Sequence, residues 1–174
     1  MSRPDLPFDG VDAAWAQFDR ALGRLTEGDA SAPSRLPGWS RAHVVAHLWG
    51  NAEGFAAAVE GTATGGVGVM YPGGVDGRAR DIDGRALLPL GVIADGARHA
   101  HSRLVDAWAD MPSDAWDRPI EMITGLVPAS ATVMARWREI AVHHIDLDVG
   151  FGPADLSADY VDADGVWLSE NRDW

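Results

Sequence analysis

Two short segments, far apart in the sequence, carry histidine and carboxylate residues at the spacing of metal ligands. In RAHVVAHLWGN, His43, His47 and Asn51 recur at every fourth position, and in RWREIAVHHID, Glu139 and His143 are also four residues apart. Side chains four apart project from one face of a helix. Two imidazoles and one carboxylate leave coordination positions open, which is typical of catalytic rather than structural metal sites. We therefore predict a catalytic metal site whose ligands are His47, Glu139 and His143.

The other histidines are predicted to have other roles. His144 follows His143 directly and is turned about 100° from it around a helix, toward an apolar stripe, so we expect it to pack in the core. Asp146 follows His143 by about one turn and is predicted to orient an imidazole through its free ring nitrogen. The remaining histidines are expected near a helix start, on the surface and at a helix seam: His43, His99 and His101.

A purely structural interpretation of the same residues also stays open. Histidines on packed helices are often ordinary core or half-exposed residues, and a Glu-x-x-x-His spacing arises by chance on amphipathic helices. The acidic residues within 81–83 and 155–164 are expected to be solvated. Three arginines beside a glycine-rich segment are either solvated or paired with an anionic substrate: Arg78, Arg80 and Arg85.

Composition excludes several classes of function. The chain has 174 residues, a formal net charge of -12 and a pI near 4.7. We therefore expect neither nucleic acid nor a membrane as a partner, because both attract clustered Lys and Arg. No segment has the pattern of a membrane span or a signal peptide, which predicts a cytoplasmic protein. The sequence contains no cysteine, so thiol chemistry would need a thiol supplied from outside.

Four amphipathic segments must position the candidate ligands. Apolar residues recur at helical spacing over 11–25, 44–59, 93–108 and 133–147. Ser40 is the expected N-cap of the second helix, Gly61 its end, and Pro128 the first residue of the fourth. The third helix is expected to begin between residues 82 and 92.

The remaining segments predict no strand. The glycine-rich stretch 61–81 is expected to form a long exposed loop, and 119–125 a connector. The predicted fold class is therefore all-α: an antiparallel four-helix bundle with long interhelical loops over 1–154, followed by an acidic tail over 155–174.

Three segments resemble a known family. LPGWSRAHVVAHLWGNAEGF, the MYPGG stretch followed by RARDID, and RWREIAVHHIDLDVGFGPADL are similar to the mycothiol-dependent maleylpyruvate isomerase family of the DinB/YfiT-like metalloenzyme superfamily. The similarity extends to about Leu156. It implies a DinB-like bundle with a divalent metal, commonly zinc, on the trio that helical spacing had already grouped. We also expect the thiol cofactor to contact three residues: Asn51, Tyr71 and Arg80.

The resemblance implies a thiol-dependent reaction of a small electrophilic substrate. A thiol such as mycothiol coordinates the metal, which lowers the thiol's pKa, and the thiolate attacks an electrophilic carbon. In an isomerase the thiolate adds to a conjugated double bond, the new single bond rotates, and the thiol leaves. A transferase keeps the adduct. Isomerases of this family continue into a C-terminal domain, which we expect to be absent here, so an electrophile other than maleylpyruvate is an equal expectation.

Two other functions stay open at this point. A metal-activated water would make the protein a hydrolase of an amide or ester, and such an enzyme would turn over without a thiol. A non-catalytic bundle would instead bind a small ligand or a partner helix. Homodimerisation through exposed tryptophans is a further expectation.

Overall fold

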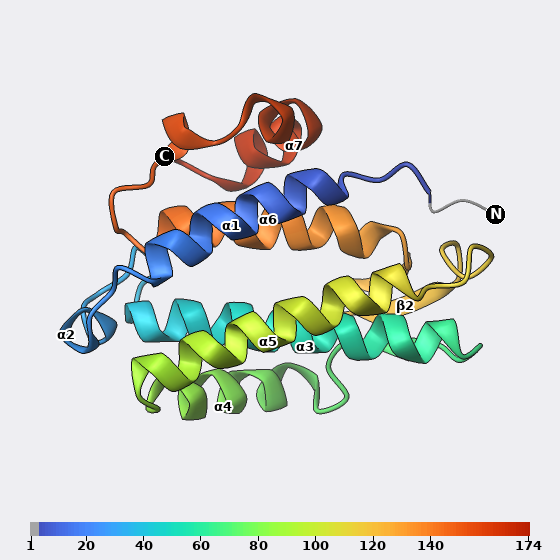
Figure 1. Ribbon diagram of the computed structural model, residues 1–174, viewed down its shortest axis with the longest axis horizontal. Helices are drawn as coiled ribbons and strands as arrows, with labels where there is room; N and C mark the ends of the chain where they lie inside the picture. Colours follow the sequence, from blue (N-terminus) through green and yellow to red (C-terminus); the bar gives the residue numbers. More distant parts are fainter. Residues whose placement is uncertain (1–3) are drawn as a thin grey trace.

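The computed structural model describes residues 4–174, so the first three residues of the predicted bundle lie outside the described residues. The fold is mainly helical, with one small sheet (Figure 1). In chain order the elements are α1 (Phe8–Leu22), α2 (Glu27–Ala30), α3 (Arg41–Ala63), β1 (Gly68–Val69), α4 (Gly74–Ala86), α5 (Leu90–Ala109), β2 (Pro119–Met122), β3 (Gly125–Pro128), α6 (Ala131–Asp146), the 3-10 turn η1 (Pro153–Asp155) and α7 (Ala158–Asn171).

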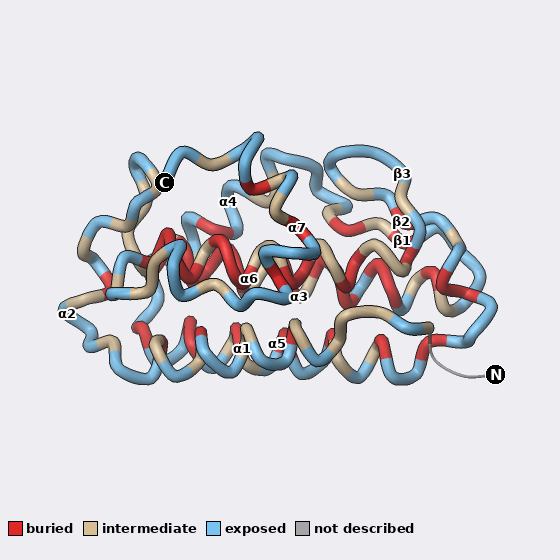
Figure 2. The backbone as a smooth tube through the Cα atoms, turned by 90° about the horizontal axis from the view of Figure 1, so that it is seen from above, coloured by how far each residue is buried: buried red, intermediate tan, exposed pale blue. Residues whose placement is uncertain are grey.

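Four long helices, α1, α3, α5 and α6, correspond to the four predicted amphipathic segments and run side by side (Figure 1). Helix α3 is the central one, because it packs against α5, α4, α6 and the sheet, while α1 packs on α6. Figure 2 shows that its buried positions continue along most of its length. The apolar stripe predicted for α6 is buried as well: Val133, Trp137, Ile140, His144 and Leu147. Among the described residues, no helix is both long and apolar enough to cross a membrane.

Local sequence signals set the start of α3 and α5. Ser40 precedes α3 in extended conformation, and its backbone N–H donates to His43 Nδ1 at 3.2 Å, which caps the first turn. Pro89 precedes α5 directly. Two predicted boundaries were wrong. Helix α3 continues past Gly61 to Ala63, and Pro128 ends β3 instead of opening α6.

The mainly helical fold was predicted correctly, but the prediction that it contains no strand was wrong. Strand β1 pairs in parallel with β2, and β2 pairs antiparallel with β3, so the stretches predicted as loop and connector form one three-stranded sheet. These strands are two to four residues long, which is too short for an alternating pattern to be read. Gly68 permits the close approach of β1 to α3, since a Cβ atom there would lie 1.8 Å from the carbonyl oxygen of Ala58.

Half of the predicted loop is a helix. In α4, Ile82 is the buried residue, and most other positions are exposed. Arg85 connects the helix to α3. Its Cζ lies 4.3 Å from the centroid of the Trp49 ring, and its Nη2 donates to Glu53 Oε2 at 2.5 Å. A helix held by one apolar contact and an arginine gives little amphipathic signal. This explains why the sequence pattern did not predict it.

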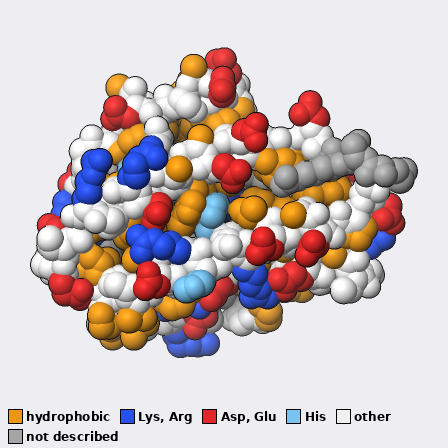
Figure 3. Space-filling view, viewed as in Figure 1, with side chains coloured by type: hydrophobic (Ala, Val, Ile, Leu, Met, Phe, Trp, Pro, Cys, Tyr) orange, Lys and Arg blue, Asp and Glu red, His pale blue; other side chains and the backbone are white. Residues whose placement is uncertain are grey.

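The acidic tail forms helix α7 and packs on α6. Arg138 makes two hydrogen bonds with the carboxylate of Asp164, at 2.7 and 2.5 Å, and the buried ring of Tyr160 lies 5.3 Å from that of Trp137. Asp164 is therefore a buried partner of an arginine, and the prediction that it would be solvated was wrong. The division of the chain at residue 154 stays a prediction. Acidic and basic side chains are interspersed over the face seen in Figure 3.

Candidate metal centre and adjoining cavities

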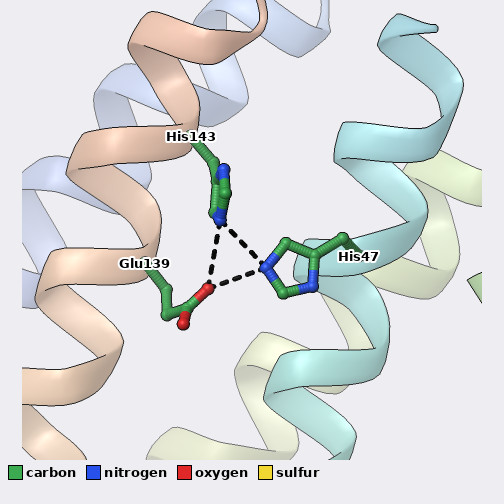
Figure 4. A group of neighbouring side chains, drawn as sticks. All are labelled: His47, Glu139 and His143. Carbon is green, nitrogen blue, oxygen red and sulfur yellow. Dashed lines mark hydrogen bonds and ion pairs between the residues drawn. The ribbon is translucent and has the colours of Figure 1, made fainter. Parts of the chain in front are cut away.

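Helices α3 and α6 bring the three predicted ligands together (Figure 4). His47 Nε2 lies 2.8 Å from Glu139 Oε2 and 3.0 Å from His143 Nε2, and the last two atoms are 3.3 Å apart. The His47 side chain is 3% exposed, that of His143 13%, and that of Glu139 31%. One donor atom from each residue therefore points to a common, partly accessible point between the two helices.

The donor set fits a divalent transition metal. Zinc ligands lie about 2.0–2.1 Å from the ion, so tetrahedral ligands are about 3.3 Å from one another. The three observed separations, 2.8, 3.0 and 3.3 Å, are close to that value. Two imidazoles and a carboxylate suit zinc, nickel and iron(II) comparably. The geometry therefore supports a metal site without choosing the metal.

The charge states of two members of the trio, His47 and Glu139, suit a cation. Burial lowers the pKa of the His47 imidazole to about 4, although Glu139 acts against this shift. Burial also acts to raise the pKa of the Glu139 carboxyl, but hydrogen bonds with His143 and His47 outweigh it and hold that pKa well below its usual value. At neutral pH, Glu139 is thus a carboxylate and His47 a neutral imidazole, which are the forms that bind metal.

The outer nitrogens of the two imidazoles have different partners. His143 Nδ1 lies 2.9 Å from Asp146 Oδ2, which is the carboxylate–histidine contact typical of metal-ligating imidazoles and was predicted from the sequence. Burial acts to lower the pKa of His143, but hydrogen bonds with Asp146 and Glu139 outweigh it and raise that pKa. Arg172, just after α7, lies 3.4 Å from the same Asp146 oxygen.

His47 Nδ1 instead faces a donor, because Arg78 Nη2 lies 3.0 Å from it. A guanidinium only donates hydrogen bonds, so Nδ1 accepts here and the neutral ring carries its proton on Nε2. An imidazole that binds a metal through Nε2 carries its proton on Nδ1. The contact between Arg78 and His47 and the binding of a metal by His47 Nε2 are therefore mutually exclusive.

The other histidines have structural surroundings. His43 caps the first turn of α3. His144 packs in the core, as predicted, with its ring stacked on Phe151 at 3.8 Å, and burial lowers its pKa to about 4. His101 is buried and stacks on Trp15 at 4.1 Å, whereas His99 is exposed. None of these four belongs to the cluster of donor atoms found among the described residues.

Two cavities adjoin the trio: His47 lines both and Glu139 lines the second, whereas His143 lines neither. The first, of about 400 Å³, lies between α3 and α4, and we call it the α4 cavity. The second, of about 250 Å³, lies against the turn between β2 and β3, and we call it the hairpin cavity. Five residues contribute to the lining of both cavities: His47, Asn51, Met70, Tyr71 and Arg78. The candidate metal centre is therefore reached from two adjoining spaces.

Two of the three expected thiol contacts line these cavities. Asn51 is held through its Oδ1, which accepts from Arg136 Nη1 at 2.7 Å. Tyr71 lies beside Asn51. Burial raises the pKa of the Tyr71 hydroxyl, whereas the charge of Arg78 and the hydrogen bonds of Tyr71 with Arg78 and Asn51 act to lower that pKa. Gly54 makes room for this segment, since a Cβ atom there would lie 2.8 Å from the Met70 carbonyl oxygen.

Arg80, the third expected contact, is exposed and lines neither cavity. Positions 78 and 80 are about 200° apart around a helix, so only Arg78 can face α3 when α4 packs there. Sequence patterns could not distinguish Arg78 from Arg80, because helix α4 itself was not predicted. The arginine at the site is Arg78.

Sequence reasoning also missed Arg136, which is fully buried. Besides Asn51, its Nη1 donates to the carbonyl oxygen of Leu48 at 3.0 Å. A signal was available, because Arg136 precedes Glu139 by three residues and His143 by seven, and so shares their helix face. An arginine is rarely buried to this extent, so the spacing alone does not predict this role.

Comparisons with known proteins identify the family and a similar fold. Residues 11–148 match the family model of the mycothiol maleylpyruvate isomerase N-terminal domain. A crystal structure of the mycothiol-dependent maleylpyruvate isomerase superposes with a TM-score of 0.86 at 25% identity, covering 94% of this chain and 70% of that one. A histidine-to-alanine mutant of that isomerase gives the same TM-score at 24% identity, covering 95% and 71%.

No curated protein sequence matches the chain. The family model nevertheless spans most of it, from the middle of the first turn of α1 to just beyond α6, and includes all three members of the trio. The chain therefore belongs to the mycothiol maleylpyruvate isomerase N-terminal domain family.

Proposed function

We propose that this protein is an enzyme that uses an external thiol of the mycothiol type to isomerise a small electrophilic molecule, and that His47, Glu139 and His143 hold a divalent metal, zinc by preference, for this reaction. The observation that carries the proposal is the meeting of three metal-type donor atoms at the junction of two cavities. Membership of the family and the similarity to an isomerase support it. We also infer that the helical core is a DinB-like four-helix bundle.

When bound, the metal would supply the positive charge that lowers the pKa of a thiol at the open position. The chain's own residues would do the rest. Glu139 remains ionised and His47 neutral, so neither must lose a proton to bind a cation. The Tyr71 hydroxyl stays protonated because burial raises its pKa. It can therefore donate a hydrogen bond to an oxygen of the substrate on which negative charge develops.

A thermal-shift series tests the metal part of the proposal. Protein freed of metal with a chelator is titrated with zinc, nickel and iron(II), because a ligand that binds only the folded state raises its apparent stability. We expect a metal-dependent shift in wild type that is lost in His47→Ala and Glu139→Gln. His99→Ala, which removes an exposed histidine, should keep the shift. An equal shift in all four proteins would refute the assignment of the ligands.

Turnover assays test the thiol part. The metal-loaded protein is incubated with cis-configured conjugated acids, with and without mycothiol, glutathione or bacillithiol. We expect conversion to the trans isomer only when a thiol is present, whereas accumulation of a thiol adduct would make the enzyme a transferase. Turnover of an ester or amide without thiol would instead support a hydrolase. If Glu139→Gln kept full activity, the site would not be catalytic, and the alternative of a non-catalytic bundle would be supported.

A further inference from the structure

The cations that line the two cavities differ in whether they have an acidic partner. In the α4 cavity, Arg85 donates to Glu53 at 2.5 Å, and Arg103 pairs with Glu60 at 2.6 Å. Arg78 lines both cavities and makes no ion pair with a carboxylate in the described part of the chain. It contacts His47 Nδ1 at 3.0 Å, hydrogen-bonds with the Tyr71 hydroxyl and lies 5.8 Å from the Tyr71 ring. One guanidinium therefore faces both cavities without an ion pair to a carboxylate.

Metal binding would release this charge further. His47 Nδ1 accepts from Arg78, and an imidazole that binds metal through Nε2 has its proton on Nδ1 and cannot accept there. In the loaded protein, Arg78 therefore loses its contact with His47 while its helix still holds it beside the cavities. A guanidinium with free N–H groups binds a carboxylate through two parallel hydrogen bonds.

The hairpin cavity is otherwise apolar on the side away from the trio. Four apolar residues line it there, Phe55, Met70, Met122 and Ile123, together with the uncharged Thr124, and its volume is about 250 Å³. This volume is below the 300–1,000 Å³ usual for drug-sized ligands, so it suits a small molecule. Glu139 is the carboxylate in its lining. A second negative charge on the ligand would thus find apolar side chains or another anion.

We propose that the electrophile is a small monocarboxylate with an apolar chain or ring, whose carboxylate binds Arg78 and whose apolar part fills the hairpin cavity. This rests on the proposed function and names its substrate class. The electrophilic carbon would then lie between the carboxylate and the apolar part, beside His47 and Tyr71, while the larger α4 cavity remains for the thiol.

Saturated analogues test this without any reaction. Binding of 4-phenylbutanoate, 4-phenylbutanol and glutarate is measured by calorimetry on wild type, Arg78→Met and Arg80→Met, each with zinc and with chelator. Arg80 is the matched control because it lies on the same helix, is exposed and has the same charge. We expect 4-phenylbutanoate to bind wild type and Arg80→Met within twofold of each other, and Arg78→Met at least tenfold more weakly.

Three further results are expected. The neutral alcohol should bind wild type and Arg78→Met equally, which shows that the cavity is intact. Glutarate should bind wild type more weakly than 4-phenylbutanoate does. Zinc should strengthen binding of 4-phenylbutanoate to wild type but not to Arg78→Met.

Several results would overturn the proposal: no binding of 4-phenylbutanoate to wild type, equal binding by the two arginine variants, glutarate binding as tightly as the monocarboxylate, or zinc strengthening binding equally in Arg78→Met. The proposed function fails separately, if 4-phenylbutanoate binds through Arg78 as expected but no conjugated acid is turned over in the presence of a thiol.

Discussion

Replacement of Asp146 by Asn should weaken metal binding although Asp146 does not itself belong to the donor trio. Its Oδ2 lies 2.9 Å from His143 Nδ1 and 3.4 Å from Arg172, and the side chain is 2% exposed. The negative charge fixes the His143 ring and increases the basicity of Nε2, which faces the centre of the trio. Loss of such a partner typically costs 10–100-fold in metal affinity, which is about 1.4–2.7 kcal/mol.

The measurement is competition for zinc between the protein and a chromophoric chelator at constant pH. The matched control is Asp148→Asn, which removes the same charge two residues later. Asp148 is half-exposed, pairs with Arg35 at the surface, and has a backbone φ of 57° that Asn tolerates. We expect the dissociation constant for zinc to rise 10–100-fold in Asp146→Asn and by less than twofold in Asp148→Asn.

Folding has to be separated from metal affinity. The free energy of unfolding of each variant is therefore measured by urea titration in the presence of chelator. Asp146→Glu, which keeps the charge, should recover part of the affinity for zinc. The reasoning is refuted if folded Asp146→Asn binds zinc as tightly as wild type, or if Asp148→Asn loses as much affinity.

Two further predictions concern stability. Gly54→Ala should lower the free energy of unfolding by about 1–3 kcal/mol, because the new Cβ would lie 2.8 Å from the Met70 carbonyl oxygen. The measurement is urea titration, with Gly84→Ala as the control because its Cβ would meet open space on α4. An equal change in the two variants would contradict the prediction. His101 is 5% exposed, and burial, followed by the charge of Arg136, lowers its pKa to about 3. Its contribution to stability is therefore complete above about pH 6.5 and is lost as the pH falls toward 3, because the unfolded chain takes up the proton first. As the pH falls from 6.5 to 4.5, the free energy of unfolding of wild type should decrease by about 2–3 kcal/mol more than that of His101→Phe. Parallel curves of unfolding free energy against pH for the two proteins would refute this.

Patterns within single helices predicted much of the site. The apolar stripes predicted helices α1, α3, α5 and α6, and most of the predicted helix ends lie within a few residues of the observed ones. The same spacing placed Glu139 and His143 on one helix face and predicted that Asp146 would hold an imidazole, whereas His47 meets them because α3 packs on α6. These predictions succeeded because residues four apart must share a helix face, whatever the rest of the chain does.

Tertiary structure decided what no local pattern contains. The strands are too short to alternate, and their pairing joins Gly68 to Ile120, 52 residues later in the chain. Helix α4 forms where packing on α3 compensates for its glycines, and that packing selects Arg78 over Arg80 for the site. The sequence by itself determined which metal-type donor side chains share a helix face, because that depends on the helical period alone. Only the fold determined which cation and which cavities face them, because these depend on contacts between segments that are distant in the chain.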